Sequence, residues 1–129
     1  MNRRKLLKAL SASATVGAVA AGRQVAHAQA GSILDEVKKR GTVRVGVRTE
    51  VPGFGIVDDT GKTVGFDVDI ANEVANRLGV KIELVPVTAA TRVPLLQQGR
   101  IDMIVATLTH YRKRDEVIDF SIGYFWTGQ

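Results

Sequence analysis

The segment GFDVDIANEVANRLGVKIELV, residues 65–85, decides the fold of this chain. Asp67 belongs to the residue types that cap helix N-termini, and Gly79 to those that end helices. Between them, small and apolar side chains recur at helical spacing: Ala71, Val74, Ala75 and Leu78. Residues 81–85 then alternate between polar and apolar, which is typical of a strand. The segment predicts an amphipathic helix that leads directly into a strand.

The sequence before this segment supplies a second helix and strand. Ser32 and Asp35 indicate the start of a helix, and Gly41 indicates its end. Valines at 43, 45 and 47 then alternate with other residues, which predicts a strand. Residues 56–57 and 63–64 flank a turn and predict a small hairpin that decorates the main sheet.

The sequence after it continues the alternation. A short helix is predicted at 93–98, ended by Gly99. Residues 101–106 form the most continuous apolar run, which suits a strand covered on both faces. Strands and helices joined in this order by short links predict right-handed crossovers and a mainly parallel sheet. The fold class is therefore α/β.

The first thirty residues have the pattern of an export signal. A basic head at 3–8 precedes a weakly apolar stretch at 9–22, and small residues at Ala28 and Ala30 suit cleavage. The paired arginines resemble a twin-arginine signal. The stretch is too short and too rich in Ser and Ala to span a bilayer. We expect an exported protein whose signal, residues 1–30, is removed.

The composition excludes several classes of function. The signal holds five of the 18 basic residues and none of the 13 acidic ones, so the remainder is neutral overall and does not suggest nucleic-acid binding. The chain has no Cys, and His110 is the only His after residue 30. No metal, cofactor or catalytic residue is expected, although enzyme chemistry is not excluded by composition.

Three arginines follow three different strands of the expected sheet: Arg48, Arg92 and Arg112. In an open parallel sheet, ligands bind beyond the carboxyl ends of the strands, where such loops converge. Guanidinium groups and neighbouring hydroxyls, among them Thr107 and Thr109, match a carboxylate. Each arginine alone would more simply be a solvated loop residue, and the threonines could be turn or cap residues. Three arginines in equivalent places favour a site for a small anion.

Four stretches together resemble the periplasmic amino-acid-binding proteins of ABC transporters, solute-binding protein family 3. They are TVRVGVR at 42–48, GKTVGFDVDIANEVANRLG at 61–79, GRIDMIVATLTHYRKRDEVIDFS at 99–121 and YFWTGQ at 124–129. The resemblance implies the type II periplasmic-binding fold. It also implies that the T-x-T-x-x-R segment, here Thr107, Thr109 and Arg112, binds the ligand α-carboxylate.

Similarity to glutamate/aspartate-binding members implies that Arg92 and Arg48 hold an acidic side chain. Phe54 completes the expected ligand-binding set, although it could equally cover the edge of the sheet. The resemblance further implies a periplasmic monomer that hands a small amino acid, glutamate or aspartate, to the membrane subunits of an ABC importer.

The expected domain organisation is a signal at 1–30, a first ligand-binding lobe at 31–122, and the start of a hinge crossover at 123–129. The sequence is thus expected to be an N-terminal fragment without the second lobe. By family resemblance, the same fold also serves cyclohexadienyl or arogenate dehydratase-like enzymes and the sensing domains of receptor kinases. The arginines alone do not separate these alternatives.

Overall fold

The computed structural model describes residues 32–127, and the expected signal therefore lies outside the described residues. In chain order the elements are α1 (Ile33–Arg40), β1 (Thr42–Val47), β2 (Glu50–Val51), β3 (Gly55–Val57), β4 (Thr63–Val64), α2 (Phe66–Leu78), β5 (Lys81–Pro86), α3 (Arg92–Gln97), β6 (Met103–Ile104) and α4 (Arg112–Asp115). Strands β5, β1 and β6 form a parallel sheet with β1 in the middle. The prediction of an α/β fold with a mainly parallel sheet is confirmed.

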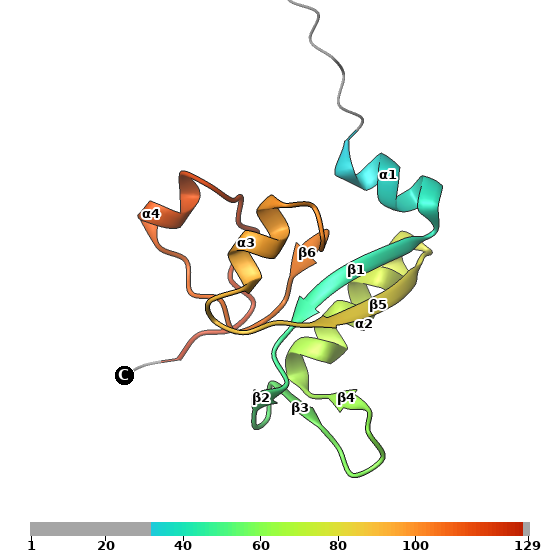
Figure 1. The fold of residues 1–129 in the computed structure, drawn as a ribbon, viewed down its shortest axis with the longest axis vertical. Coiled ribbons are helices and arrows are strands. Elements are labelled where there is room, and N and C mark those ends of the chain that lie inside the picture. The colour runs from blue at the N-terminus through green and yellow to red at the C-terminus, as the bar shows by residue number, and fades with distance from the viewer. Residues whose placement is uncertain (1–31, 128–129) are drawn as a thin grey trace, which may run out of the picture.

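The central strand β1 has a different core on each of its faces. Its alternating valines pack with Ala71 and Ala75 of α2, which lies along one face of β1 and β5 (Figure 1). Gly46 faces the other way, where a Cβ atom would meet Ile101 and Val87. Those two residues form a second core cluster with Ala106, under α3. The period of two in the strand therefore creates two separate apolar layers.

The helix boundaries follow the expected chemistry in most places. The Ser32 hydroxyl accepts a hydrogen bond from the Leu34 N–H at the start of α1. Gly41 and Gly79, both left-handed, follow the last residues of α1 and α2. The hairpin at 56–57 and 63–64 is also confirmed, with Ile56 opposite Val64. It belongs to a separate antiparallel sheet, β2-β3-β4, and does not extend the main one.

Three details of the sequence prediction were wrong. Asp67 is not the N-cap of α2, because the helix begins at Phe66 and Gly65 occupies the cap position. The strand expected at 101–106 is reduced to Met103–Ile104, since only these residues pair with β1. Helix α4 was not expected, and it lies in the connection after β6 that was predicted to carry the anion site.

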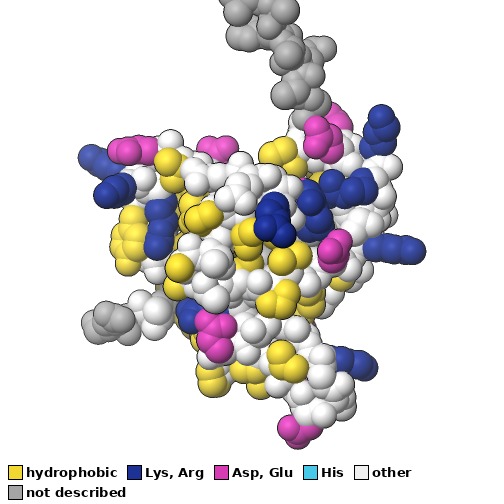
Figure 2. Space-filling view, in the orientation of Figure 1, with side chains coloured by type: hydrophobic (Ala, Val, Ile, Leu, Met, Phe, Trp, Pro, Cys, Tyr) yellow, Lys and Arg dark blue, Asp and Glu magenta, His cyan; other side chains and the backbone are white. Residues whose placement is uncertain are grey.

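The outer surface has no single basic stripe on the face seen in Figure 2. Several Lys and Arg side chains lie next to one another to the right of centre, and the others are scattered among neutral, hydrophobic and acidic ones. Within residues 32–127, no helix is both long and apolar enough to cross a membrane.

Candidate functional site

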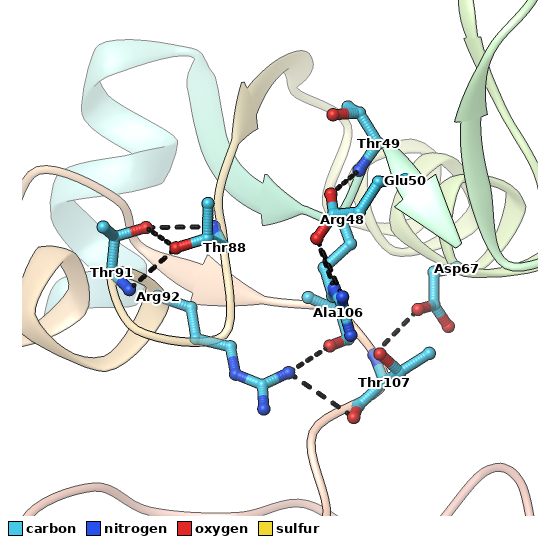
Figure 3. Close-up of polar contacts among 9 residues, drawn as sticks. All are labelled: Arg48, Thr49, Glu50, Asp67, Thr88, Thr91, Arg92, Ala106 and Thr107. Atoms are coloured by element: carbon cyan, nitrogen blue, oxygen red, sulfur yellow. Dashed lines mark hydrogen bonds and ion pairs between the residues drawn. The ribbon is translucent and has the colours of Figure 1, made fainter.

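The candidate site lies where the connections after β1, β5 and β6 meet. Arg48 directly follows β1, Arg92 begins α3 after β5, and Thr107 follows β6. Figure 3 shows the three side chains converging from these separate connections. The carboxyl ends of the parallel strands bring these three residues together.

Arg92 is the buried centre of the site, with only 6% of its surface exposed. Its Nη1 donates to the carbonyl oxygens of Ala106, at 2.5 Å, and Thr107, at 3.4 Å. Its Nε is buried and has no hydrogen-bond partner among the described residues. Burial lowers the pKa of Arg92, and the positive charges of Arg114 and Arg48 lower it further. The guanidinium groups of Arg114 and Arg48 are therefore close enough to repel that of Arg92.

Thr107 occupies a strained position beside Arg92. Its φ of 48° is left-handed, which is rare for a β-branched residue. Its N–H donates to Asp67 Oδ2 at 2.8 Å. Its Oγ1 is buried and, like Arg92 Nε, has no hydrogen-bond partner within the described part of the chain. A buried polar atom without a partner is costly, so both atoms suit contact with a ligand.

Arg48 is half-buried and already paired. Its Nη2 and Nε donate to Glu50 Oε1 at 2.8 Å and 3.0 Å, and the Thr49 N–H donates to Glu50 Oε2 at 3.2 Å. The bond from Arg48 is the main cause of the lowered pKa of Glu50. The pair fixes the direction of the Arg48 side chain, which extends toward Ala106 (Figure 3).

The two threonines that precede α3 bind each other. The Thr88 N–H donates to Thr91 Oγ1 at 3.0 Å, and the Thr91 N–H donates to Thr88 Oγ1 at 3.2 Å. Both hydroxyls are therefore occupied within a turn. Their role is to shape the connection that carries Arg92.

The positive charge of Arg114 lowers the pKa of Arg92, and Arg112 has no such effect. Arg112 is exposed at the first position of α4. Arg114 is half-buried, donates from Nη1 to the carbonyl of Thr109 at 2.6 Å, and lies over the Tyr111 ring at 4.8 Å. The sequence offers both arginines, two residues apart, and only the course of the chain into α4 decides between them. Thr109 itself is exposed and contributes its carbonyl.

Phe54 contributes to an aromatic wall rather than to the arginine cluster. Its ring lies 4.9 Å from that of Phe125 and 6.1 Å from that of Phe66, both edge-to-face. Phe66 is 38% exposed. Tyr124 joins the wall through Phe66 and donates its hydroxyl hydrogen to Asp67 Oδ1 at 2.9 Å. The wall therefore includes residues beyond 122, which were predicted to begin a crossover.

The charges of the site define its chemistry. They are three guanidinium groups, on Arg48, Arg92 and Arg114, and two carboxylates, of which Glu50 pairs with Arg48 and Asp67 accepts from the Thr107 N–H. Burial raises the pKa of Asp67, against the effect of its hydrogen bonds. No group of three or more His, Cys, Asp or Glu residues that could hold a metal ion occurs within residues 32–127. The arrangement is suited to bind a small anion.

Comparison with known proteins connects this geometry to a family. Residues 43–129 match the family model for bacterial extracellular solute-binding proteins, family 3. The chain is 44% identical over 100 residues to the glutamine-binding protein of Geobacillus stearothermophilus, covering 74% of this chain and 38% of that protein. It is 31% identical over 134 residues to the glutamate/aspartate import solute-binding protein of Salmonella typhimurium, covering 95% of this chain and 44% of that protein.

Solved structures give the same answer for the fold. The arginine-bound form of domain 1 from TmArgBP is 43% identical, with a TM-score of 0.68, and the match covers 70% of this chain and 72% of that one. The ancestral amino-acid-binding protein AncCDT-1, described as a precursor of cyclohexadienyl dehydratase, is 41% identical, with a TM-score of 0.71, over 73% of this chain and 41% of that one.

These matches confirm the fold and the family expected from the sequence. The described residues form a lobe of the type II periplasmic-binding fold. The chain spans about two fifths of the length of the curated relatives it matches. It belongs to the bacterial extracellular solute-binding proteins, family 3.

Proposed function

We propose that this chain forms a ligand-binding lobe of a periplasmic solute-binding protein that delivers an acidic amino acid, glutamate or aspartate, to an ABC importer. The observation that carries the proposal is a pair of buried atoms, Arg92 Nε and Thr107 Oγ1, that have no hydrogen-bond partner among residues 32–127. Arg92 also bonds to the Thr107 carbonyl, and the charges of Arg48 and Arg114 act on it. A carboxylate is the group that would satisfy such donors.

The balance of charge supports an acidic ligand. The three arginines outnumber the two carboxylates, so the site carries one positive charge in excess. Glutamate and aspartate have one net negative charge near neutral pH, whereas glutamine has none. An arginine side chain would bring a further positive charge to guanidinium groups that already repel one another. Charge complementarity therefore favours the acidic amino acids over both.

The two carboxylates of the ligand would be divided between the arginines. Arg114, in the connection that also carries Thr107, suits the α-carboxylate that all amino acids share. Arg92 and Arg48 suit the side-chain carboxylate, because they come from the two other connections. This assignment keeps the division expected from the family resemblance but replaces Arg112 with Arg114. Phe54 and its aromatic neighbours would cover the apolar part of the ligand.

The names of the relatives include several amino acids, so the identity of the ligand must be tested directly. One is a glutamine-binding protein, and another, in Rhodobacter capsulatus, is 37% identical and binds glutamate, glutamine, aspartate and asparagine, as its name states. We expect glutamate or aspartate to raise the melting temperature of the protein most in a panel of the twenty amino acids, because a ligand that binds only the native state stabilises it. A larger shift with glutamine or arginine would refute the acidic assignment.

Catalysis is the second candidate because of AncCDT-1, which is described as a precursor of cyclohexadienyl dehydratase. A dicarboxylate substrate would also suit three arginines. We propose binding rather than catalysis, since the anion site consists mainly of donors and, among residues 32–127, its two carboxylates, Glu50 and Asp67, are both hydrogen-bonded. Incubation with arogenate, followed by chromatography, tests this, and turnover would refute it.

A further inference from the structure

The carboxylate of Asp67 connects three parts of the molecule. It lies in the first turn of α2 and is 1% exposed. Its Oδ2 accepts a hydrogen bond from the Thr107 N–H at 2.8 Å, and its Oδ1 accepts one from the Tyr124 hydroxyl at 2.9 Å. Figure 3 shows the first of these bonds. The two partners follow Asp67 by 40 and 57 residues.

The Asp67 carboxylate does not accept hydrogen bonds from the first-turn N–H groups of α2 in the described residues. An acidic residue in the first turn of a helix ordinarily accepts from the free N–H groups there. Neither oxygen of Asp67 does so among the described residues, since each bonds to a distant segment. A role limited to starting α2 therefore does not account for this buried carboxylate.

The bond to Thr107 acts on the one non-glycine residue with a left-handed backbone among residues 32–127. A β-branched residue keeps such a conformation only where its surroundings determine it. Here the Thr107 N–H is held by Asp67, while its carbonyl and that of Ala106 are held by Arg92. The peptide is thus fixed on both sides.

The backbone conformation of Thr107 determines where its carbonyl and its hydroxyl lie in the anion site. In the left-handed state its carbonyl reaches Arg92, and its Oγ1 is buried without a partner in the described chain. An extended Thr107 would redirect both groups. We propose that Asp67 is a positioning residue of the anion site, which holds Thr107 in its binding conformation and connects it to residue 124. This inference rests on the proposed function of that site.

The experiment compares Asp67→Ala with Asp69→Ala, an exposed residue two positions along the same helix. Two quantities are measured on the ¹⁵N-labelled protein: the hydrogen-exchange rate of the Thr107 amide and the affinity for glutamate by titration. In Asp67→Ala we expect the exchange to be faster and the affinity weaker, each by at least roughly tenfold, as for loss of a hydrogen bond to a charged group. Asp69→Ala should change each by less than about twofold.

Asp67→Asn provides the conservative variant. Its amide oxygen can accept from the Thr107 N–H, and its amide nitrogen can donate to the Tyr124 oxygen. We expect affinity to recover to within about threefold of the original, because the geometry is retained without the charge. If Asp67→Ala does not fold, Tyr124→Phe removes one of the two bonds and should still speed Thr107 exchange and weaken glutamate binding. No change in either quantity would overturn the inference.

Thr107→Gly separates positioning from general stability. Glycine adopts a positive φ unaided, so adding Asp67→Ala to Thr107→Gly should weaken binding by less than about threefold more. Two results would overturn this inference but leave the proposed function intact. One is that Asp67→Ala weakens glutamate binding by the same factor in the wild-type and the Thr107→Gly protein. The other is that Asp67→Ala speeds the exchange of the Thr107 amide but leaves the affinity for glutamate unchanged. A wild-type protein that binds none of the amino acids would overturn the proposed function, and this inference with it.

Discussion

Arg92 Nη1 donates a hydrogen bond of 2.5 Å to the carbonyl oxygen of Ala106, and so joins the connection after β5 to the connection after β6. The guanidinium lies in a buried position, which is unusual for a charged group without a carboxylate partner. The positive charges of Arg114 and Arg48 both lower its pKa further. An incoming anion would relieve this repulsion, and the first prediction follows from it.

Arg92→Ala should weaken glutamate binding by roughly 30-fold to several thousand-fold, because removing one member of a buried charged pair costs about 2–5 kcal/mol. Glutamine should lose less, since its side chain carries no charge for Arg92 to hold. Calorimetry with both ligands measures the two losses. Arg100→Ala, an exposed arginine nearby in sequence, is the control and should bind normally. Equal losses for glutamate and glutamine would argue against an acidic ligand.

The second prediction separates two arginines that lie two residues apart. Arg114→Ala should weaken glutamate and glutamine alike, by at least roughly 30-fold, because both ligands share the α-carboxylate. Arg112→Ala should change affinity by less than about twofold, since Arg112 is exposed at the start of α4. Isothermal titration of the two variants side by side provides the comparison. The reverse order of effects would restore the assignment made from the sequence motif.

The sequence predicted the main elements because their signals are local. The alternating valines of β1 and the helical spacing in α2 reflect burial on one face, which the folded chain retains. The end of β6 is different. Residues 101–106 are apolar except for Asp102, but only Met103 and Ile104 pair with β1, and the composition of the run does not show where this pairing begins and ends.

Strand order accounts for the two arginines that the sequence placed together. The carboxyl ends of parallel strands place Arg48 and Arg92 together, so their convergence follows from the topology. The choice of Arg114 depends on how residues 108–112 enter a helix of only four residues, which no periodic pattern encodes. Asp67 was misassigned because a cap residue and a buried acceptor for a distant N–H have the same sequence signal.

The third prediction concerns Gly65, whose φ is 135° and whose added Cβ would lie 2.4 Å from the Phe54 carbonyl oxygen. Gly65→Ala should therefore lower the free energy of unfolding by about 2–5 kcal/mol, from backbone strain together with a clash against backbone. Gly61→Ala is the matched control, because its φ is also positive but open space surrounds it. Its cost should be only about 1–2 kcal/mol. Urea denaturation measures both, and similar values would contradict the role of the clash.

The last prediction concerns acid stability, which depends on Asp102 at the opposite end of the sheet from the arginine site. Its Oδ2 accepts from the Arg44 N–H at 2.8 Å and from Arg40 Nη2 at 2.5 Å, and its Oδ1 accepts from Arg44 Nη2 at 2.8 Å. Burial alone would raise the pKa of Asp102, but the bonds from Arg44 outweigh burial and lower it. A carboxyl whose pKa is lower in the folded state stabilises that state above its unfolded pKa of about 3.9.

That stabilisation is lost as the pH falls through the folded pKa of Asp102, because protonation removes the charge that Arg44 and Arg40 bind. Asp102→Asn should therefore cost about 1–3 kcal/mol of unfolding free energy at pH 7 and distinctly less near pH 3. The pKa of Asp67 is raised, so its own contribution to stability has the opposite pH dependence. Because Asp67 is present in both the wild type and Asp102→Asn, that contribution cancels when the two free energies of unfolding are subtracted. Asp59→Asn, in an exposed turn, should show little cost at either pH. Denaturant unfolding at the two pH values measures this, and a pH-independent cost for Asp102→Asn would mean that its charge does not stabilise the fold.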